Sequence, residues 1–281
     1  MLHCGSYTLA LDRPLVMGIV NLTPDSFSGD GLANDIERAV EHAWRQIEAG
    51  ADILDLGAES SRPGAIPTAV DEELRRLLPV LDALAGCGVP LSVDTCKPEV
   101  MRASLAGGAS MINDIRALTM PGALAAVAAS DCAVCLMHMQ GTPLTMQQQP
   151  SYGNVVAEVR RFLQARAEAA IAAGIRPERL VLDPGFGFGK TLAHNLELLR
   201  HCAQLSPAGM PILAGISRKS MLGMLTGQAV EQRLAASLSA ALLAAQRGAR
   251  ILRVHDVAET VAALTVWHAV EGCAENAAEL R

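Results

Sequence analysis

One arrangement recurs eight times along the chain: a short apolar run ends at polar residues and is followed by a stretch with apolar residues at helical spacing. Such runs favour buried strands, and the periodic stretches favour helices that pack on them. The expected strands are residues 15–20, 53–57, 91–93, 111–112, 133–137, 180–182, 211–215 and 251–254. The expected helices are 34–49, 70–85, stretches from Pro98 and from Pro121, 155–173, 192–202, 231–246 and a closing helix to about Glu271.

Eight strand-helix units predict an α/β fold, a closed (β/α)₈ barrel, which typically takes about 250 residues. No change of composition divides the chain, so we expect one domain over residues 1–281. An open, doubly wound sheet of eight strands is the alternative. The residues from Cys273 onward are expected to form a frayed tail, and 139–150 a solvated linker.

Charge and composition exclude several classes of protein. The net charge is −6 and Lys and Arg form no block, which argues against a nucleic-acid binder. Apolar runs fall short of the ~18 residues of a membrane span, and the first residues lack the layout of a signal peptide. Seven scattered cysteines favour a reduced, cytoplasmic protein. Cys132 and Cys135 have the spacing of a redox pair, but their apolar surroundings predict two buried thiols.

The stretch from Pro211 to Met221 is expected to bind an anion. It passes from an apolar strand into helix-forming sequence, and Arg218 and Lys219 lie at the junction. The first turn of a helix presents unpaired N–H groups and the positive end of the helix dipole. Two cations beside such a turn favour a negatively charged group.

Polar residues stand at or near the carboxyl ends of most of the expected strands. In a barrel these ends meet at one rim, where active sites lie. Any single one could cap a helix or be a solvated charge, but their coincidence indicates a site. The residues are Asn21, Asp55, Asp94, Asn113, Asp183, Lys219, Arg253 and His255.

These side chains form two chemical sets. Asp94, Asn113 and Asp183 offer hydrogen-bond acceptors that suit an amino-substituted heterocycle. A second set, made of Asn21, Arg62, Arg253 and His255, suits a phosphate group with a divalent ion. We therefore expect a ring and an anion to bind side by side.

Familiar nucleotide and zinc motifs are missing from the sequence. The run from Gly185 to Thr191 ends like a phosphate-binding P-loop, but Pro184 stands where the first glycine is required. No correctly spaced glycine triplet opens a helix, and the seven histidines include no close pair suited to zinc.

Eight short motifs in order give the chain a resemblance to bacterial dihydropteroate synthases over nearly its whole length. Any one tetrapeptide is weak evidence, whereas eight in register are specific. They are residues 21–28, 59–64, 92–95, 112–115, 137–141, 183–190, 217–220 and 253–256.

The resemblance implies a (β/α)₈ barrel and a transferase of folate biosynthesis, in which 4-aminobenzoate displaces pyrophosphate from 6-hydroxymethyl-7,8-dihydropterin pyrophosphate to give 7,8-dihydropteroate. It also implies Mg²⁺ as cofactor, a homodimer and a target of sulfonamides. The implied pterin residues are Asp55, Asp94, Asn113, Met137, Asp183 and Lys219. The implied pyrophosphate residues are Asn21, Arg62, Arg253 and His255, with Mg²⁺ bridging Asn21 and phosphate oxygens. The implied 4-aminobenzoate residues are Ser61, Pro63, Phe188, Lys219 and Ser220.

The residue types suit a dissociative mechanism in which pyrophosphate leaves before the amine attacks. Asp94, Lys219, Arg253 and His255 are the expected catalytic residues. No Ser–His or Cys–His pair is visible among the rim residues, so we expect no covalent nucleophile.

The second loop departs from the family pattern at two positions, with Ser61 in place of Thr and Ala58 in place of Gly. Ser61 lacks one methyl group, so Ser61→Thr should change 4-aminobenzoate binding by less than ~1.5 kcal/mol. A hundredfold change in its KM would contradict this expectation.

Two rival functions use the same barrel. A pterin-dependent methyltransferase, which moves a methyl group from a folate to a corrinoid, needs no pyrophosphate site, so Arg253 and His255 count against it. A catalytically silent pterin-binding paralogue should have lost loop or anion residues, and here all are present.

Overall fold

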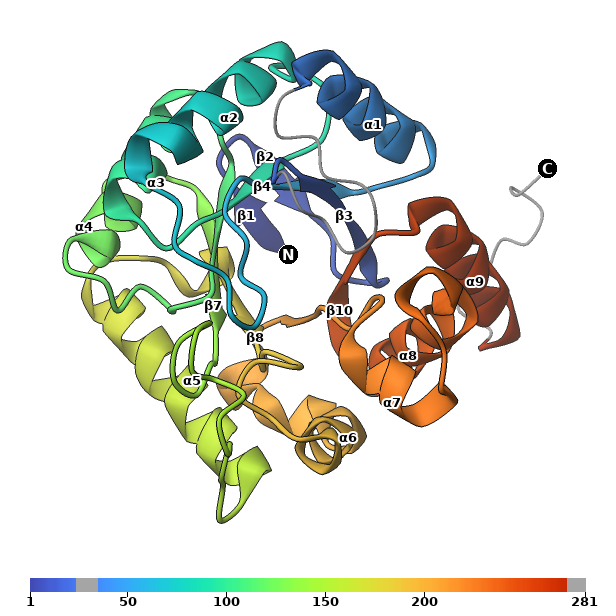
Figure 1. Ribbon diagram of the computed structural model, residues 1–281. Coiled ribbons are helices and arrows are strands. Elements are labelled where there is room, and N and C mark those ends of the chain that lie inside the picture. The colour runs from blue at the N-terminus through green and yellow to red at the C-terminus, as the bar shows by residue number, and fades with distance from the viewer. Residues whose placement is uncertain (24–34, 272–281) are drawn as a thin grey trace.

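The computed structural model describes residues 1–23 and 35–271 of the chain. Eight parallel strands close into a barrel in the order β10-β3-β4-β5-β6-β7-β8-β9 (Figure 1). The expected (β/α)₈ barrel is confirmed, and the open sheet is excluded. The barrel strands are β3 (Leu15–Asn21), β4 (Ile53–Gly57), β5 (Leu91–Asp94), β6 (Met111–Asp114), β7 (Ala133–Met137), β8 (Leu180–Asp183), β9 (Ile212–Ala214) and β10 (Ala249–Val254).

Helices surround the barrel and connect successive strands (Figure 1). Local capping fixes several of their starts: the side chains of Asp35, Asn154 and Thr191 each accept a hydrogen bond from a backbone N–H three residues on. The helices are α1 (Ile36–Glu48), α2 (Val70–Ala83), α3 (Pro98–Ala106), α4 (Ala123–Ala128), α5 (Val155–Ala172), α6 (Leu192–Arg200), α7 (Ser220–Thr226), α8 (Leu234–Gln246) and α9 (Val257–Val270). No described helix is both long and apolar enough to cross a membrane.

The structure differs from the expected elements in a few places. An unexpected antiparallel hairpin, β1 (Leu2–Cys4) with β2 (Tyr7–Leu9), precedes the barrel. The helix-forming sequence expected after Ser217–Ser220 is a separate short helix, α7, which ends at Thr226, before α8 begins. Helix α4 begins at Ala123 rather than at Pro121. The expected tail from Cys273 and most of the first loop lie outside the described residues.

Side-chain alternation along the strands divides the barrel interior into an apolar end and a polar end. Successive strand residues point to opposite faces, so residues two apart share a face. The buried cluster inside the barrel consists of Leu2, Cys4, Leu15, Met17, Ile53, Met111, Ala133, Cys135, Val181, Leu213 and Ile251. One or two steps further along the same strand faces come Asn21, Asp55, Asn113, Met137, Asp183 and Arg253. The strand pattern therefore turns these six side chains toward the interior at one rim.

The cysteines of the suspected redox pair are buried thiols, as expected. Cys132 is 3% exposed and Cys135 is fully buried, and both are free. Burial raises the pKa of both thiols, so neither is reactive at neutral pH.

Candidate active site

Asp55 is the buried centre of the polar rim. Its carboxylate is fully buried and accepts hydrogen bonds from Ser92 Oγ (2.6 Å), Asn113 Nδ2 (3.0 Å) and Arg253 Nε (2.6 Å). Because Asn113 gives its amide N–H to Asp55, its carbonyl oxygen can accept a hydrogen bond from a ligand. Asp55 therefore fixes the orientation of the Asn113 and Arg253 side chains.

Arg253 joins two carboxylates that were expected to bind the ring. Its Nε lies 2.6 Å from Asp55 and its terminal nitrogen 3.0 Å from Asp94. The two chemical sets expected from the sequence are in direct contact, because the expected anion residue Arg253 pairs with Asp94 of the ring set as well as with Asp55.

The carboxyl of Asp94 has a pKa near neutral pH. Burial raises the pKa of its carboxyl to about 7, and the nearby carboxylates of Asp55 and Glu73 raise it too, while Arg253 lowers it. A carboxyl with such a pKa can exchange a proton or hold a negative charge at physiological pH.

Lys219 and Asp183 belong to neighbouring units of the barrel, after β9 and at the end of β8, and each affects the pKa of the other. Burial lowers the pKa of Lys219 to about 8, and Asp183 opposes the shift. The Lys219 ammonium donates to the carbonyl of Phe186 and lies 4.6 Å from the centre of the Phe188 ring. Burial raises the pKa of Asp183, whose carboxylate accepts from the Gly185 amide at 2.6 Å.

Phe188 also belongs to a small apolar cluster at the rim. The cluster contains Cys96, Ile115 and the expected pterin residue Met137, which is 3% exposed, with Met139 and Phe188 packed against it. Apolar side chains next to a few directed polar groups are typical of ligand sites for flat rings.

The glycine-rich loop from Gly185 to Gly189 is held rigidly beneath Lys219. Gly185 has φ +66°, and a Cβ there would lie 2.0 Å from the carbonyl oxygen of His138, so only glycine fits. Lys190 is 3% exposed, and its ammonium donates to the carbonyls of Gly185 and Phe188, both at 2.9 Å. The lysine that resembles a P-loop lysine is therefore a structural residue of this loop.

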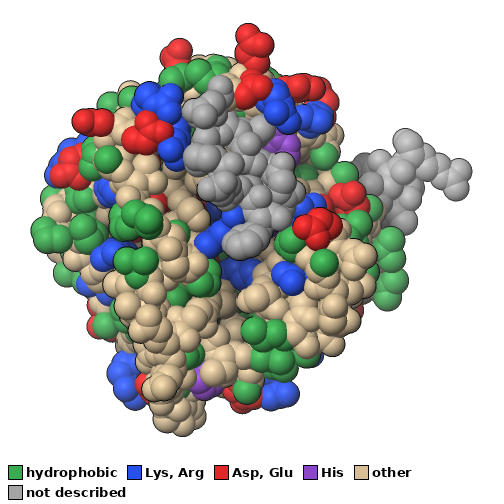
Figure 2. Space-filling model, viewed as in Figure 1, with side chains coloured by type: hydrophobic (Ala, Val, Ile, Leu, Met, Phe, Trp, Pro, Cys, Tyr) green, Lys and Arg blue, Asp and Glu red, His purple; other side chains and the backbone are tan. Residues whose placement is uncertain are grey.

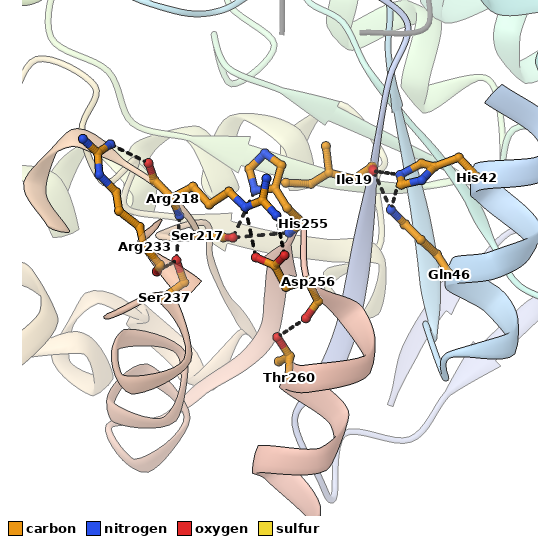
Figure 3. Close-up of polar contacts among 10 residues, drawn as sticks. All are labelled: Ile19, His42, Gln46, Ser217, Arg218, Arg233, Ser237, His255, Asp256 and Thr260. Carbon is orange, nitrogen blue, oxygen red and sulfur yellow. Dashed lines mark hydrogen bonds and ion pairs between the residues drawn. The ribbon is translucent and has the colours of Figure 1, made fainter. Parts of the chain in front are cut away.

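The junction between β9 and α7 differs from the expected anion site. Arg218 was expected to be one of two cations for an anion, but its guanidinium forms an ion pair with Asp256, at 3.0 Å for Nε (Figure 3). Its backbone has φ +58° and is held by Ser237 Oγ and by Arg233, at 2.9 and 3.0 Å. Arg218 therefore holds the backbone of this turn in place. Lys219 is the cation that the turn offers to a ligand at the rim.

His255 lies beside the same turn. Its Nδ1 is 3.0 Å from Ser217 Oγ, and its backbone N–H donates to that oxygen at 3.3 Å (Figure 3). Ser217 thus fixes the orientation of the ring. Ser220, the first residue of α7, is exposed.

The loop between β4 and α2, residues 58–69, extends over the middle of the barrel (Figure 1). The Gly64 amide donates to the carbonyl of Pro143, in the loop after β7, at 3.0 Å. Ser61 and Arg62 are half-buried and Pro63 is exposed. On this face of the molecule, Lys and Arg side chains gather in a central hollow (Figure 2).

The segment 139–150 makes more contacts than a solvated linker would. Besides the bond from Gly64 to Pro143, Gln147 Nε2 donates to the carbonyl of Gly187 at 2.5 Å. This segment therefore joins the loops that follow β4 and β8, whereas a solvated linker was expected.

The described residues contain no group of three or more His, Cys, Asp or Glu side chains placed to hold a metal ion. Asn21, at the end of β3, brings an amide oxygen to the rim. Mg²⁺ commonly takes one or two protein oxygens together with substrate phosphates. The donor set at this rim therefore fits an ion that arrives with a phosphorylated substrate.

Comparisons with known proteins agree with this geometry. The family model described as "Pterin binding enzyme" matches residues 17–255. The dihydropteroate synthase of Escherichia coli (strain K12) is 52% identical over 270 residues, which cover 96% of each chain. The crystal structure of Burkholderia cenocepacia dihydropteroate synthase with 7,8-dihydropteroate superposes with a TM-score of 0.90 at 51% identity, covering 97% of both chains. The Yersinia pestis dihydropteroate synthase in a sulfonamide drug complex gives 0.93 at 49%, covering 96% of this chain and 99% of that one. The chain therefore belongs to the pterin-binding enzymes and, among them, to the dihydropteroate synthases.

Proposed function

We propose that this rim condenses 6-hydroxymethyl-7,8-dihydropterin pyrophosphate with 4-aminobenzoate to give 7,8-dihydropteroate and pyrophosphate. The observation that carries the proposal is the network of Asp55, Asp94, Asn113 and Arg253 at the carboxyl ends of the barrel strands, in a chain half identical to dihydropteroate synthases. The polar groups of this network are already arranged in the protein without substrate, and their arrangement suits the condensation reaction.

The pterin ring binds on the acidic side of the rim. Asp94, Asn113 and Asp183 accept hydrogen bonds from its ring N–H and amino groups, and Lys219 donates to a ring acceptor. Asp55 holds Asn113 in place, and Met137 supplies an apolar wall. Burial raises the pKa of Asp94 and of Asp183 and so disfavours their charged forms, and a ligand that donates hydrogen bonds to them would stabilise those forms.

The pyrophosphate binds among Asn21, Arg62, Arg253 and His255. The guanidinium of Arg253 has five N–H donors. When substrate binds, it can donate to a phosphate oxygen and still keep its hydrogen bond to Asp55. Asn21 would hold Mg²⁺ through its amide oxygen, and the bound ion supplies positive charge that stabilises the leaving pyrophosphate. Ser61, Pro63, Phe188, Lys219 and Ser220 surround 4-aminobenzoate, and the same surface takes sulfonamides.

The reaction proceeds by dissociation. The bond between the pterin methylene carbon and the bridging oxygen breaks, and pyrophosphate takes the electron pair while Arg62, Arg253 and His255 neutralise its charge. The ionised Asp94 carboxylate stabilises the cationic pterin. The amine of 4-aminobenzoate then attacks the methylene carbon, the new C–N bond forms, and the amine gives its proton to water. No side chain becomes covalently attached, so a pterin-protein adduct found by mass spectrometry during turnover would contradict this mechanism.

The experiment is pyrophosphate release from the dihydropterin pyrophosphate with Mg²⁺, run with and without 4-aminobenzoate. We expect protein-dependent release that 4-aminobenzoate accelerates, with dihydropteroate as product. A folded protein that binds a pterin and releases no pyrophosphate would exclude the proposed function.

The active protein is a cytoplasmic homodimer. Four large apolar side chains on α7 and α9 support the dimer, namely Met224 (68% exposed), Leu225 (53%), Val266 (65%) and Val270 (77%). Sedimentation equilibrium should give twice the chain mass, and Met224→Lys should shift the mass toward that of the monomer. The buried free thiols of the six described cysteines accord with a reducing compartment.

A further inference from the structure

A partly buried ion-pair cluster holds the base of the loop over the barrel. Lys97 Nζ lies 2.8 Å from Glu59 Oε2, in the loop of residues 58–69, and 2.5 Å from Glu73 Oε2, on α2. The side chains are 14%, 13% and 1% exposed, respectively. The cluster therefore joins three elements: the loop, α2 and the turn that leads into α3.

Glu59 also closes the loop on itself. Its other carboxylate oxygen accepts from the backbone N–H of Thr68 at 2.7 Å, across nine residues. The amide of Gly64 is fixed at the far end by Pro143. Ser61, Arg62 and Pro63 lie between these two anchors, so the position of all three depends on Glu59.

Lys97 connects this loop to the pterin side of the rim. It follows Asp94 by three residues, at the end of β5. A movement of Lys97 would thus separate the loop from the strand that carries Asp94. No residue of the cluster belongs to the groups assigned to substrate.

Stability alone does not account for the cluster. Replacing a buried ion pair by apolar side chains of similar size is often neutral or stabilising. Two carboxylates share one ammonium, and burial raises the pKa of Glu73 although Lys97 opposes the shift. An ion pair is directional, so it can fix the position of the loop of residues 58–69 relative to α2 and β5. This role explains why charged residues stand here, which apolar packing does not.

We propose that Lys97 and Glu59 are positioning residues for the second substrate, 4-aminobenzoate, and that they hold Ser61 and Pro63 over the rim in register with Asp94. The proposal rests on the proposed function. Neither residue touches substrate, and each acts through the backbone of the loop.

The test compares Lys97→Met and Glu59→Gln with Arg75→Gln. Arg75 is a matched control because it pairs with Glu72 on the same helix α2, on the exposed surface. In steady-state assays, Lys97→Met and Glu59→Gln should raise the KM for 4-aminobenzoate by about tenfold or more. The affinity for 6-hydroxymethyl-7,8-dihydropterin, which lacks the pyrophosphate that Arg62 binds, should change by less than about twofold in calorimetry. Lys97→Arg should recover part of the loss in KM. Arg75→Gln should match the wild type.

Two results would overturn the proposal: folded Lys97→Met and Glu59→Gln variants with an unchanged KM for 4-aminobenzoate, or equal losses of pterin affinity and of 4-aminobenzoate KM, which would indicate a general loss of structure. Hydrogen exchange separates this failure from a failure of the proposed function. Lys97→Met should speed amide exchange in residues 58–69 and leave 185–189 unchanged, whether or not the wild type makes dihydropteroate.

Discussion

At the scale of single residues, Asp94 makes the site sensitive to pH. Below about pH 7 the Asp94 carboxyl is protonated, because burial has raised its pKa to about 7. A pterin that donates hydrogen bonds prefers the ionised form, so pterin affinity should rise as pH increases through 7. Isothermal titration between pH 6 and 8 should show this slope.

The matching variant is Asp94→Asn, which keeps the shape of the side chain and cannot ionise. Its pterin affinity should be lower than that of the wild type at pH 8 by about tenfold or more, with a flat pH dependence. An unchanged slope in Asp94→Asn would assign the titration to another group, such as Asp183.

Arg253 should tolerate no other cation. Lysine carries one point charge and cannot bridge Asp55 and Asp94, so Arg253→Lys leaves part of a buried carboxylate uncompensated. We expect a loss of about 2–4 kcal/mol in the free energy of unfolding, together with a lower kcat. Urea denaturation and steady-state assays measure the two effects. If Arg253→Lys is as stable as the wild type, the ion pairs of Arg253 with Asp55 and Asp94 contribute to substrate binding and not to stability.

At the scale of elements, strand periodicity explains how much of the site the sequence could predict. The apolar runs located the eight strands, and their polar ends located the rim. What periodicity could not predict is which partners those side chains choose. Arg218 pairs with Asp256 from another strand-helix unit, and Arg253 pairs with two carboxylates from β4 and β5. Such pairs join residues from different strand-helix units, and no local pattern encodes them.

The glycine-rich loop after β8 gives a prediction at the same scale. Gly185→Ala places a methyl group against the His138 carbonyl and should cost at least about 3 kcal/mol of unfolding free energy. Gly174→Ala is the matched control, because Gly174 also has positive φ, at +94°, but nothing lies within 4 Å of its Cβ position. It should lose only about 1–2 kcal/mol. Equal losses in thermal or urea unfolding would show that the loop moves aside for the methyl group.

At the scale of the whole molecule, the closed end of the barrel contributes to stability and carries none of the residues assigned to substrate. One end is closed by the hairpin of β1 and β2, whose buried Leu2 and Cys4 join the apolar cluster inside the barrel. The opposite end carries the polar rim. The hairpin was not expected because each strand has only three residues, too few for a periodic signal.

This separation predicts that a defect at the closed end lowers stability without lowering activity. Leu2 is fully buried, so Leu2→Ala should leave a cavity and cost about 2–5 kcal/mol. Because the rim is built from the other ends of the strands, kcat and both KM values should stay at wild-type levels below the new melting temperature. Thr8→Ala, on an exposed position of the same hairpin, should change stability by less than about 0.5 kcal/mol. If Leu2→Ala lowers kcat at a temperature where the protein is fully folded, the apolar layer at the closed end also sets the positions of Asp55 and Arg253, and the two ends of the barrel are mechanically coupled.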